Sequence, residues 1–260
     1  MEVGVLRFID SHTHTYLRGP EDLELMSVSG VEGVIICSFF PVQPSGFSTL
    51  HDLFRWVMEE EPMRLSSYGI SSRVAVGIHP RSIPEADLKA VLDHILALFD
   101  NEKVSALGEV GLETGSQEEE YVLTQQIRIA NEYPVPMIIH TPRNNKEKIL
   151  ERLISIIETE NVDPARVIID HLTPNLVERV RAIGANAGLT VQPGKLTPKD
   201  VHEVILKNGP EGIVLNSDIG NKPSDPLSLP RVAHYLDRAG VSGRDIQMIT
   251  YSNIRSLIPL

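Results

Sequence analysis

The sequence predicts a single (β/α)8 barrel, an α/β fold in which residues 1–260 form one domain. Eight short runs rich in Val and Ile recur along the chain, and longer segments with apolar residues at helical spacing separate them. No linker rich in Gly or Ser interrupts this alternation. Strands that alternate with helices in this way form parallel βα units, and about 250 residues is the usual length of a closed barrel. A doubly wound open sheet is the alternative that the same pattern allows.

The eight apolar runs are the expected strands. Each run is short and continuous, which is typical of a strand that is buried on both faces. In a barrel the C-terminal ends of all the strands face one mouth, where the active sites of this fold lie. The runs are 5–10, 31–38, 74–78, 105–109, 136–140, 167–170, 187–192 and 213–216.

Helix signals fill the segments between the strands. Ser116 and Glu119 have the spacing of a capping box and predict a helix that runs through Glu132. Pro84 is expected to open an earlier helix, whose apolar residues share one face and pack in the core. These residues are Leu88, Val91, Leu92, Ile95 and Phe99.

Two further helices carry signals at both ends. Thr173-Pro174 and Thr197-Pro198 each pair an N-cap hydroxyl with a proline at the first helical position. Gly184 and Gly209 stand where these helices should end.

The longest connection, residues 39–73, contains three prolines. We expect a loop followed by a helix that is broken near Glu61-Pro62, because proline has no N–H and disrupts a helix interior. Phe54 and Trp56 in this connection are expected to pack in the core, with a lid over the barrel mouth as the alternative.

Composition and charge exclude several classes of protein. The 24 Lys and Arg residues face 35 Asp and Glu residues, and the net charge of -11 should repel phosphate backbones and anionic membranes. The single cysteine, Cys37, allows no intramolecular disulfide and favours the cytoplasm. Every apolar run is far shorter than the roughly 18 residues that a membrane span requires, and residues 1–5 show no export signal.

Histidines gather at the ends of the expected strands. His12 and His14 follow the first apolar run, and residues i and i+2 of a strand point to the same side, so their imidazoles should converge. Histidines that merely fill core positions have no reason to gather at strand ends. Five of the nine histidines stand there: His12, His14, His79, His140 and His171.

Two carboxylates join this set. Glu109 and Asp218 each close an apolar run, so they should face the same barrel mouth as the histidines. Imidazole nitrogen combined with carboxylate oxygen suits Zn²⁺, Mn²⁺ or Fe²⁺ better than an all-oxygen Ca²⁺ or Mg²⁺ site, although Mg²⁺ could support turnover at a weakly occupied second position. The number of candidate ligands is sufficient for one or two ions, with a carboxylate shared between them.

With these residues the chain resembles the TatD-like metal-dependent hydrolases of the amidohydrolase superfamily. The resemblance spans nearly the whole chain, and its landmarks appear in the family order. They are Asp10-Ser11-His12-Thr13-His14, Gly77-Ile78-His79-Pro80, Gly108-Glu109-Val110-Gly111-Leu112, Pro136-Met137-Ile138-Ile139-His140, Asp170-His171, Asn216-Ser217-Asp218 and Asn253.

The resemblance implies a set of metal ligands and catalytic roles. Glu109 would bridge two ions, in the place where other amidohydrolases use a carboxylated lysine. Asp218 would bind one ion and take the proton from the attacking water, so that Glu109 and Asp218 are the expected catalytic residues. His79 would contact the substrate rather than a metal. The implied ligands are His12, His14, Glu109, His140, His171 and Asp218.

The chain departs from the family pattern around the expected substrate. Where the family often has His-Ser-Arg after the fifth strand, the chain has His140-Thr141-Pro142-Arg143, which displaces the arginine by one residue. Asn216 stands in place of a usual glutamate, and Glu113 stands in place of an aspartate. The segment Gln192-Pro193-Gly194-Lys195 puts a lysine at the mouth.

Further polar residues have expected roles around the ligands. Arg81, Arg143 and Lys195 follow strand ends and would neutralise the charge of a phosphoester substrate. Asp10 and Asp170 are expected to accept the second N–H of a ligating histidine, and we place Asn216 with them outside the ligand set. Either aspartate could instead be a buried acid that accepts backbone hydrogen bonds.

These observations together predict hydrolysis by a metal-activated water, on a small phosphoester or on a nucleic-acid end. The first alternative is hydrolysis of an amide, a lactone or a carboxyl ester, which needs the same water. The second is a non-catalytic binding module that retains a metal. Stable nucleic-acid binding is not expected, because aromatic residues make up 5% of the chain and no cluster of Lys and Arg occurs. The sequence indicates no oligomeric state and no membrane partner.

Overall fold

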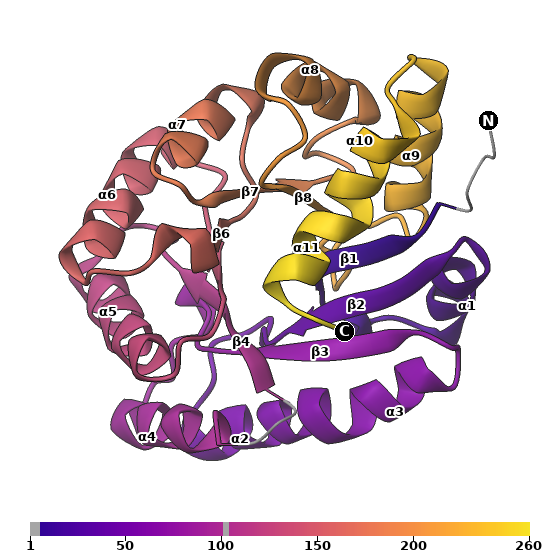
Figure 1. Ribbon diagram of the computed structural model, residues 1–260. Helices are drawn as coiled ribbons and strands as arrows, with labels where there is room; N and C mark the ends of the chain where they lie inside the picture. The colour runs from indigo at the N-terminus through magenta and orange to yellow at the C-terminus, as the bar shows by residue number, and fades with distance from the viewer. Residues whose placement is uncertain (1–5, 101–103) are drawn as a thin grey trace.

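The computed structural model describes residues 6–100 and 104–260. Its eight parallel strands are hydrogen-bonded in sequence order from β1 to β8, and helices surround them in a ring (Figure 1). Backbone bonds also join the two ends of this sheet, because His14 N–H donates to Ile219 O at 2.7 Å and Asp218 N–H to His12 O at 3.1 Å. The predicted (β/α)8 barrel is therefore confirmed, and the alternative of an open sheet is wrong.

The strands fall on the predicted apolar runs. The first strand continues to Thr13, so that His12 lies inside it, whereas Val5, its predicted start, lies outside the described residues. The strands are β1 (Phe8–Thr13), β2 (Val31–Cys37), β3 (Ser71–Val76), β4 (Val104–Gly111), β5 (Met137–His140), β6 (Val167–Ile169), β7 (Asn186–Thr190) and β8 (Ile213–Asn216).

Helices follow the strands around the barrel. No helix in the described part of the chain is long and apolar enough to cross a membrane. The helices are α1 (Pro20–Val28), α2 (Phe47–Arg55), α3 (Glu61–Ser66), α4 (Leu88–Leu98), α5 (Gln117–Glu132), α6 (Lys146–Thr159), α7 (Val177–Ala182), α8 (Pro198–Asn208), α9 (Ser228–Arg238), α10 (Gly243–Gln247) and α11 (Asn253–Leu257).

Two of the predicted helix caps are formed as side-chain hydrogen bonds. The Thr197 hydroxyl accepts from Asp200 N–H, and the Asp200 carboxylate accepts from Thr197 N–H, which is a complete capping box. At α5 the box is only half formed. Ser116 accepts from Glu119 N–H, but the Glu119 carboxylate binds the N–H groups of the preceding turn, residues 113–115. The Glu119 side chain thus holds the loop that follows β4.

Two predicted helix starts are wrong. The helix expected from Pro84 begins at Leu88, because Asp87 adopts a left-handed conformation with φ of 62° immediately before it. Thr173-Pro174 opens a short 3-10 turn, and its hydroxyl binds the Asn175 side chain instead of a backbone N–H. The glycines predicted to end α7 and α8 both follow those helices with positive φ.

The long connection after β2 is helical through its expected break. A π-helical turn, Trp56–Glu60, joins α2 to α3, and Pro62 lies in the first turn of α3, where a missing N–H is tolerated. Phe54 is fully buried, as core packing predicted, whereas Trp56 is 45% exposed and packs against Tyr16. Neither Phe54 nor Trp56 is among the described residues that line the cavity at the barrel mouth.

The barrel interior is divided into an apolar part and a polar part. Ile9 and residues of six other strands, β2 to β6 and β8, form an apolar cluster, which Ile254 and Ile258 from the α11 region complete. In Figure 1, α11 lies across this end of the barrel. The side chains that follow Ile9 on β1 are polar and buried, namely Asp10, Ser11, His12 and Thr13. Buried polar groups require partners, so these residues must be satisfied by each other and by neighbouring strands.

Gly188 on β7 makes room for one of these partners. A Cβ atom at this position would lie 2.9 Å from Asp170 Cα and closer still to the Asp170 carboxylate. Asp170 is fully buried and cannot withdraw into solvent. The absence of a side chain at Gly188 is therefore a condition for placing a carboxylate at the end of β6.

Replacing Gly188 by Ala should lower the free energy of unfolding by about 1–3 kcal/mol, the usual range for forcing extra atoms into a packed interior. Urea unfolding measures this change. Gly243→Ala is the matched control, because a Cβ there meets nothing within 4 Å. A Gly188→Ala protein as stable as the control would show that the interior tolerates the methyl group.

Candidate active site

Six side chains from five strand ends meet at one mouth of the barrel. Five of them are buried, while the Asp218 side chain is 19% exposed. A cavity of about 720 Å³ opens over them and has most of the six in its wall. The group consists of the six implied ligands: His12 and His14 from β1, Glu109 from β4, His140 from β5, His171 after β6 and Asp218 after β8.

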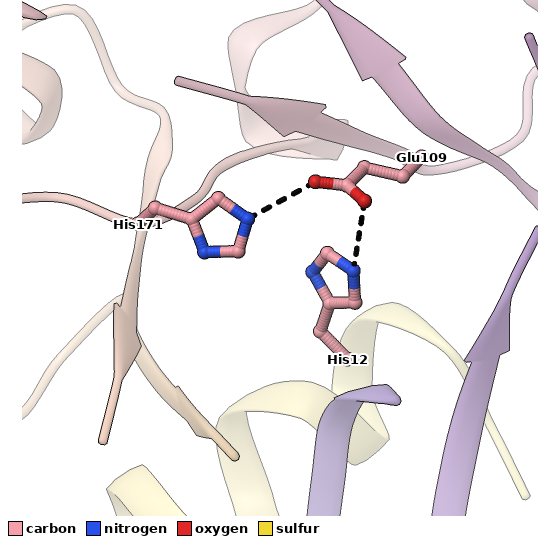
Figure 2. A group of neighbouring side chains, drawn as sticks. All are labelled: His12, Glu109 and His171. Atoms are coloured by element: carbon pink, nitrogen blue, oxygen red, sulfur yellow. Dashed lines mark hydrogen bonds and ion pairs between the residues drawn. The ribbon is translucent and has the colours of Figure 1, made fainter. Parts of the chain in front are cut away.

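Glu109 lies at the centre of this group. Its Oε1 atom is 2.9 Å from His140 Nδ1 and 3.0 Å from His171 Nε2. Its Oε2 atom is 3.3 Å from His12 Nε2 and 3.6 Å from His14 Nε2. Figure 2 shows the carboxylate between His12 and His171, with one oxygen directed at each ring. Burial would raise the pKa of Glu109, but the surrounding imidazoles hold it well below its ordinary value.

His12 and His14 direct their Nε2 atoms at each other across 3.3 Å. The Nδ1 atom of His14 lies 2.8 Å from the Cys37 carbonyl oxygen, which only accepts, so this nitrogen carries a proton. The Nδ1 atom of His12 lies 2.6 Å from the Asp170 carboxylate. Both rings are thereby held with Nε2 facing the centre, where a proton or a cation is needed between the two nitrogens.

The residues present fit a divalent metal. Two nitrogens bound to one tetrahedral Zn²⁺ at 2.0–2.1 Å are about 3.3 Å apart, which matches the spacing of His12 and His14. Imidazole with carboxylate is also the donor set that Zn²⁺, Mn²⁺ and Fe²⁺ prefer. In the described part of the chain, three groups have ligand atoms within 4.8 Å of one another: His12, Glu109 and His171; His12, His14 and Asp218; His79, Glu109 and His140.

Asp170 joins several residues of the site. One oxygen accepts from His12 Nδ1, and the other accepts from the His171 backbone N–H at 2.7 Å. The amide of Asn216 donates to both oxygens, at 2.9 and 3.0 Å. Asp170 thus fixes one ring directly, and Asn216 fixes Asp170.

Asp10 differs from its expected role. Its carboxylate accepts from the Ser217 backbone N–H at 3.0 Å and from the Ser217 hydroxyl at 2.5 Å. Its further contact is the His12 backbone N–H at 3.4 Å, and among the described residues no imidazole ring bonds to it. Burial raises the pKa of Asp10 to about 6. Asp10 therefore matches the alternative prediction of a buried acid that accepts backbone hydrogen bonds. Through Ser217 it holds the segment that leads to Asp218.

Two of the six side chains stand on left-handed backbone. His171 has φ of 60° and Asp218 has φ of 47°, conformations that residues other than glycine adopt rarely. Such strain persists only where surrounding contacts impose it, and it gathers at functional sites. Both residues lie two positions beyond a strand end, where the chain must turn sharply to keep the side chain over the barrel.

His79 lies beside Glu109 rather than in the cavity wall. Its Nδ1 atom accepts from Arg81 N–H at 2.9 Å, so Nε2 carries the ring proton, and His79 is not a ligand in the group that it forms with Glu109 and His140. This N–H lies 3.6 Å from Glu109 Oε2. Burial lowers the pKa of His79 to about 3, which keeps the ring neutral. His79 is not among the described residues that line the cavity.

The three expected cations all line the cavity. Arg81 stacks on Phe39 at 5.0 Å and lies 3.7 Å from the Glu113 carboxylate. Lys195 donates to Asp218 Oδ2 at 2.6 Å and lies 3.0 Å from His171 Nδ1. These contacts of Lys195 with two of the six central residues follow from the turn after β7.

Sequence analysis missed several polar residues of the cavity. Glu113, noted only as a departure from the family, is 2.8 Å from His140 Nε2. The Gln192 amide donates to Asp218 Oδ2 at 2.7 Å. Lys146 and Lys222 also line the cavity, and burial lowers the pKa of Lys146 to about 8. Glu113 and Gln192 lie two residues beyond β4 and β7, and Lys146 is the first residue of α6. Sequence analysis read Glu113 and Gln192 only as parts of departures from the family pattern, and it assigned no role to Lys146 or Lys222.

Comparisons with known proteins identify the family of the chain. The family model for TatD related DNase matches residues 9–259. A protein of Methanocaldococcus jannaschii described as an uncharacterized metal-dependent hydrolase is 34% identical over 253 residues, covering 97% of this chain and 100% of that protein. The crystal structure of a TatD-like protein from Archaeoglobus fulgidus has a TM-score of 0.83 and 31% identity, covering 97% of this chain and 100% of that one.

A more distant structure has the same fold. The phosphotriesterase homology protein of Escherichia coli, crystallised with phosphate in its active site, has a TM-score of 0.72 and 15% identity. The match covers 97% of this chain and 98% of that chain.

A barrel whose mouth gathers imidazoles and carboxylates at metal-ligand spacing defines a metal-dependent hydrolase of the amidohydrolase type. The chain belongs to the TatD related DNase family. The resemblance predicted from the ordered motifs is confirmed, and the alternative of a non-catalytic module that retains a metal is set aside.

Replacing Asp170 by Asn should weaken the binding of Zn²⁺ by about 10- to 100-fold, because an amide no longer offers the charged acceptor that orients His12. Competition with a chromophoric chelator measures the affinity. Asp237→Asn, which removes an exposed carboxylate from α9, is the control. Equal affinities in the two variants would mean that Asp170 does not support a metal ligand.

Proposed function

We propose that the protein hydrolyses a phosphoester with a metal-activated water, and that the six central residues hold one or two divalent ions. A divalent ion, when bound, lowers the pKa of water and polarises the oxygen of the bond to be cleaved. The observation that carries the proposal is the shared Glu109 carboxylate, whose two oxygens face imidazoles from different strands. Zn²⁺, Mn²⁺ and Fe²⁺ are the favoured ions, with Mg²⁺ as a weaker substitute.

Asp218 is the proposed base. Burial would raise the pKa of its carboxyl group, but Lys195 and the neighbouring histidines hold this pKa well below its ordinary value, so the carboxylate is ionised. Its Oδ1 atom lies 3.4 Å from His14 Nε2, at the edge of the cavity. The accepted proton would then pass to the leaving group.

Cationic side chains in the cavity support an anionic substrate. Arg81, Arg143 and Lys195 are the proposed substrate contacts, and Lys146 and Lys222 add positive charge to the same wall in a chain of net charge -11. Among the described residues that line the cavity, Phe39 is the only Phe, Tyr or Trp, and Arg81 covers its ring. A site with so little surface for base stacking suits a small phosphoester or a nucleic-acid end better than a long bound strand.

Hydrolysis of an amide, a lactone or a carboxyl ester is the second candidate. Arg81 and Lys195, two of the three proposed anion contacts, already face the carboxylates of Glu113 and Asp218. A neutral carbonyl substrate would leave both pairs in place and use the same activated water. We further propose that residues 1–260 act as one domain in the cytoplasm, without stable nucleic-acid or membrane partners.

Asp218→Asn should lower kcat by about 100- to 10,000-fold, because the amide cannot accept the proton from the attacking water. The assays are cleavage of end-labelled single-stranded DNA with Mg²⁺, Mn²⁺ and Zn²⁺ in turn, and turnover of small phosphoesters, lactones and amides.

The outcomes separate the candidates. DNA shortening or phosphate release that the variant loses supports the phosphoesterase. Turnover of only lactones or amides would replace the first candidate with the second. Equal rates in the wild-type protein and the variant would remove Asp218 as the base.

Arg143→Ala should raise KM for an anionic substrate about tenfold while the bound metal stays constant. The side chain lines the cavity, and in the described structure it forms no hydrogen bond or ion pair with the six central residues. Steady-state kinetics and metal analysis of the same samples provide both quantities. Arg238→Ala, at the end of α9, is the control. Loss of metal in the Arg143 variant would instead make this arginine structural.

A further inference from the structure

Lys146, the first residue of α6, joins two loops at the barrel mouth. Its ammonium group donates to the Thr141 hydroxyl at 2.7 Å, to the Thr141 carbonyl at 3.2 Å and to the His171 carbonyl at 2.7 Å. The Thr141 hydroxyl in turn donates to the Asp170 carbonyl at 2.7 Å. An ammonium group has three N–H donors, so these acceptors use all of them. Lys146 therefore ties the end of β5 to the turn after β6.

His171, at the end of this connection, is held from both sides by charged groups. Its backbone N–H donates to the Asp170 carboxylate at 2.7 Å, and its carbonyl accepts from Lys146. Between these contacts the residue has φ of 60°, which a histidine adopts only when its surroundings require it. The two opposite charges thus fix the peptide groups on either side of the strained residue.

The direction of the His171 ring depends on this backbone. In the present conformation Nε2 lies 3.0 Å from Glu109 Oε1, and Nδ1 lies 2.7 Å from the Thr190 hydroxyl. A relaxed backbone would turn the Cα–Cβ bond away from the centre of the barrel mouth. The ring would then leave Glu109, because a buried side chain has few alternative rotamers that reach the same point.

We propose that Lys146 is a positioning residue, which holds the left-handed backbone of His171 and so keeps its imidazole directed at Glu109. The inference rests on the proposed function, in which His171 is a metal ligand. Lys146 differs in this role from Arg143 and Lys195, because its donors are committed to protein oxygens and none is free for a substrate.

Amide hydrogen exchange in the metal-free protein tests the proposal directly. Lys146→Met should accelerate exchange of the His171 and Leu172 amides at least tenfold, since the turn loses one of its two charged supports. Lys148→Met is the matched control, because it removes an exposed lysine two residues further along the same helix. Equal exchange rates in the two variants would overturn the proposal.

Binding of Co²⁺ gives a second, spectroscopic test. Lys146→Met should bind Co²⁺ about 10- to 100-fold more weakly than Lys148→Met and should change the visible absorption of the bound ion, because one ligand is misdirected. Lys146→Arg, which keeps the charge and donors, should restore most of the affinity. If Lys146 only stabilised the fold, Lys146→Met would lower the free energy of unfolding and leave the absorption of the bound Co²⁺ unchanged. This result would contradict the positioning role.

The design separates this inference from the proposed function. Hydrogen exchange needs neither metal nor substrate, so faster exchange without turnover of any substrate would keep the role of Lys146 and remove the hydrolysis proposal. Lost turnover in the Lys146→Met variant, with hydrogen exchange and Co²⁺ absorption unchanged, would remove the positioning role of Lys146 and keep the hydrolysis proposal. If Lys146→Met does not fold, Lys146→Gln, whose side chain is one atom shorter and keeps two N–H donors without the charge, undergoes the same measurements.

Discussion

The buried carboxylate of Glu109 is the group around which the barrel mouth is organised. An ionised carboxylate that is only 2% exposed is costly unless charged or hydrogen-bonded partners surround it. Here the partners are imidazoles from four different strand ends, so the strands must keep their register for the charge to be satisfied. The same interaction therefore constrains the closure of the barrel and the placement of the candidate ligands.

The fold supplies this constraint through small local features. Gly188 leaves room for Asp170, Asp170 orients His12, and Asn216 holds Asp170 in turn. On the far side, Asp10 holds Ser217, which precedes Asp218. None of these supporting groups needs to touch a metal. They restrict the orientation of the side chains that would bind the metal, and proteins tune metal affinity in this way without changing the ligands.

Much of the fold and the membership of the central cluster could be predicted from the sequence. Parallel strands buried on both faces must be continuous apolar runs, and strand ends of a barrel must face one mouth, so His12, Glu109 and His171 could be placed together from their positions alone. The pattern could not distinguish Asp10 from Asp170. Which carboxylate meets an imidazole depends on side-chain direction and on the space left by Gly188.

Contacts made by loops were equally beyond the sequence. Lys195 reaches Asp218 because the chain turns back after β7, and Lys146 reaches His171 across two loops. The helix expected at Pro84 starts four residues later for a similar reason, since a left-handed residue rather than the proline sets its first turn. Such features follow from tertiary packing, which local spacing does not encode.

Anomalous X-ray scattering from crystals grown with Zn²⁺ or Mn²⁺, combined with metal analysis of the dissolved crystals, tests the central claim most directly. The account predicts an anomalous peak about 2.0–2.2 Å from His12 Nε2 and from a Glu109 oxygen. Metal bound only at other positions, or crystals without metal at this cluster in the presence of either ion, would contradict it.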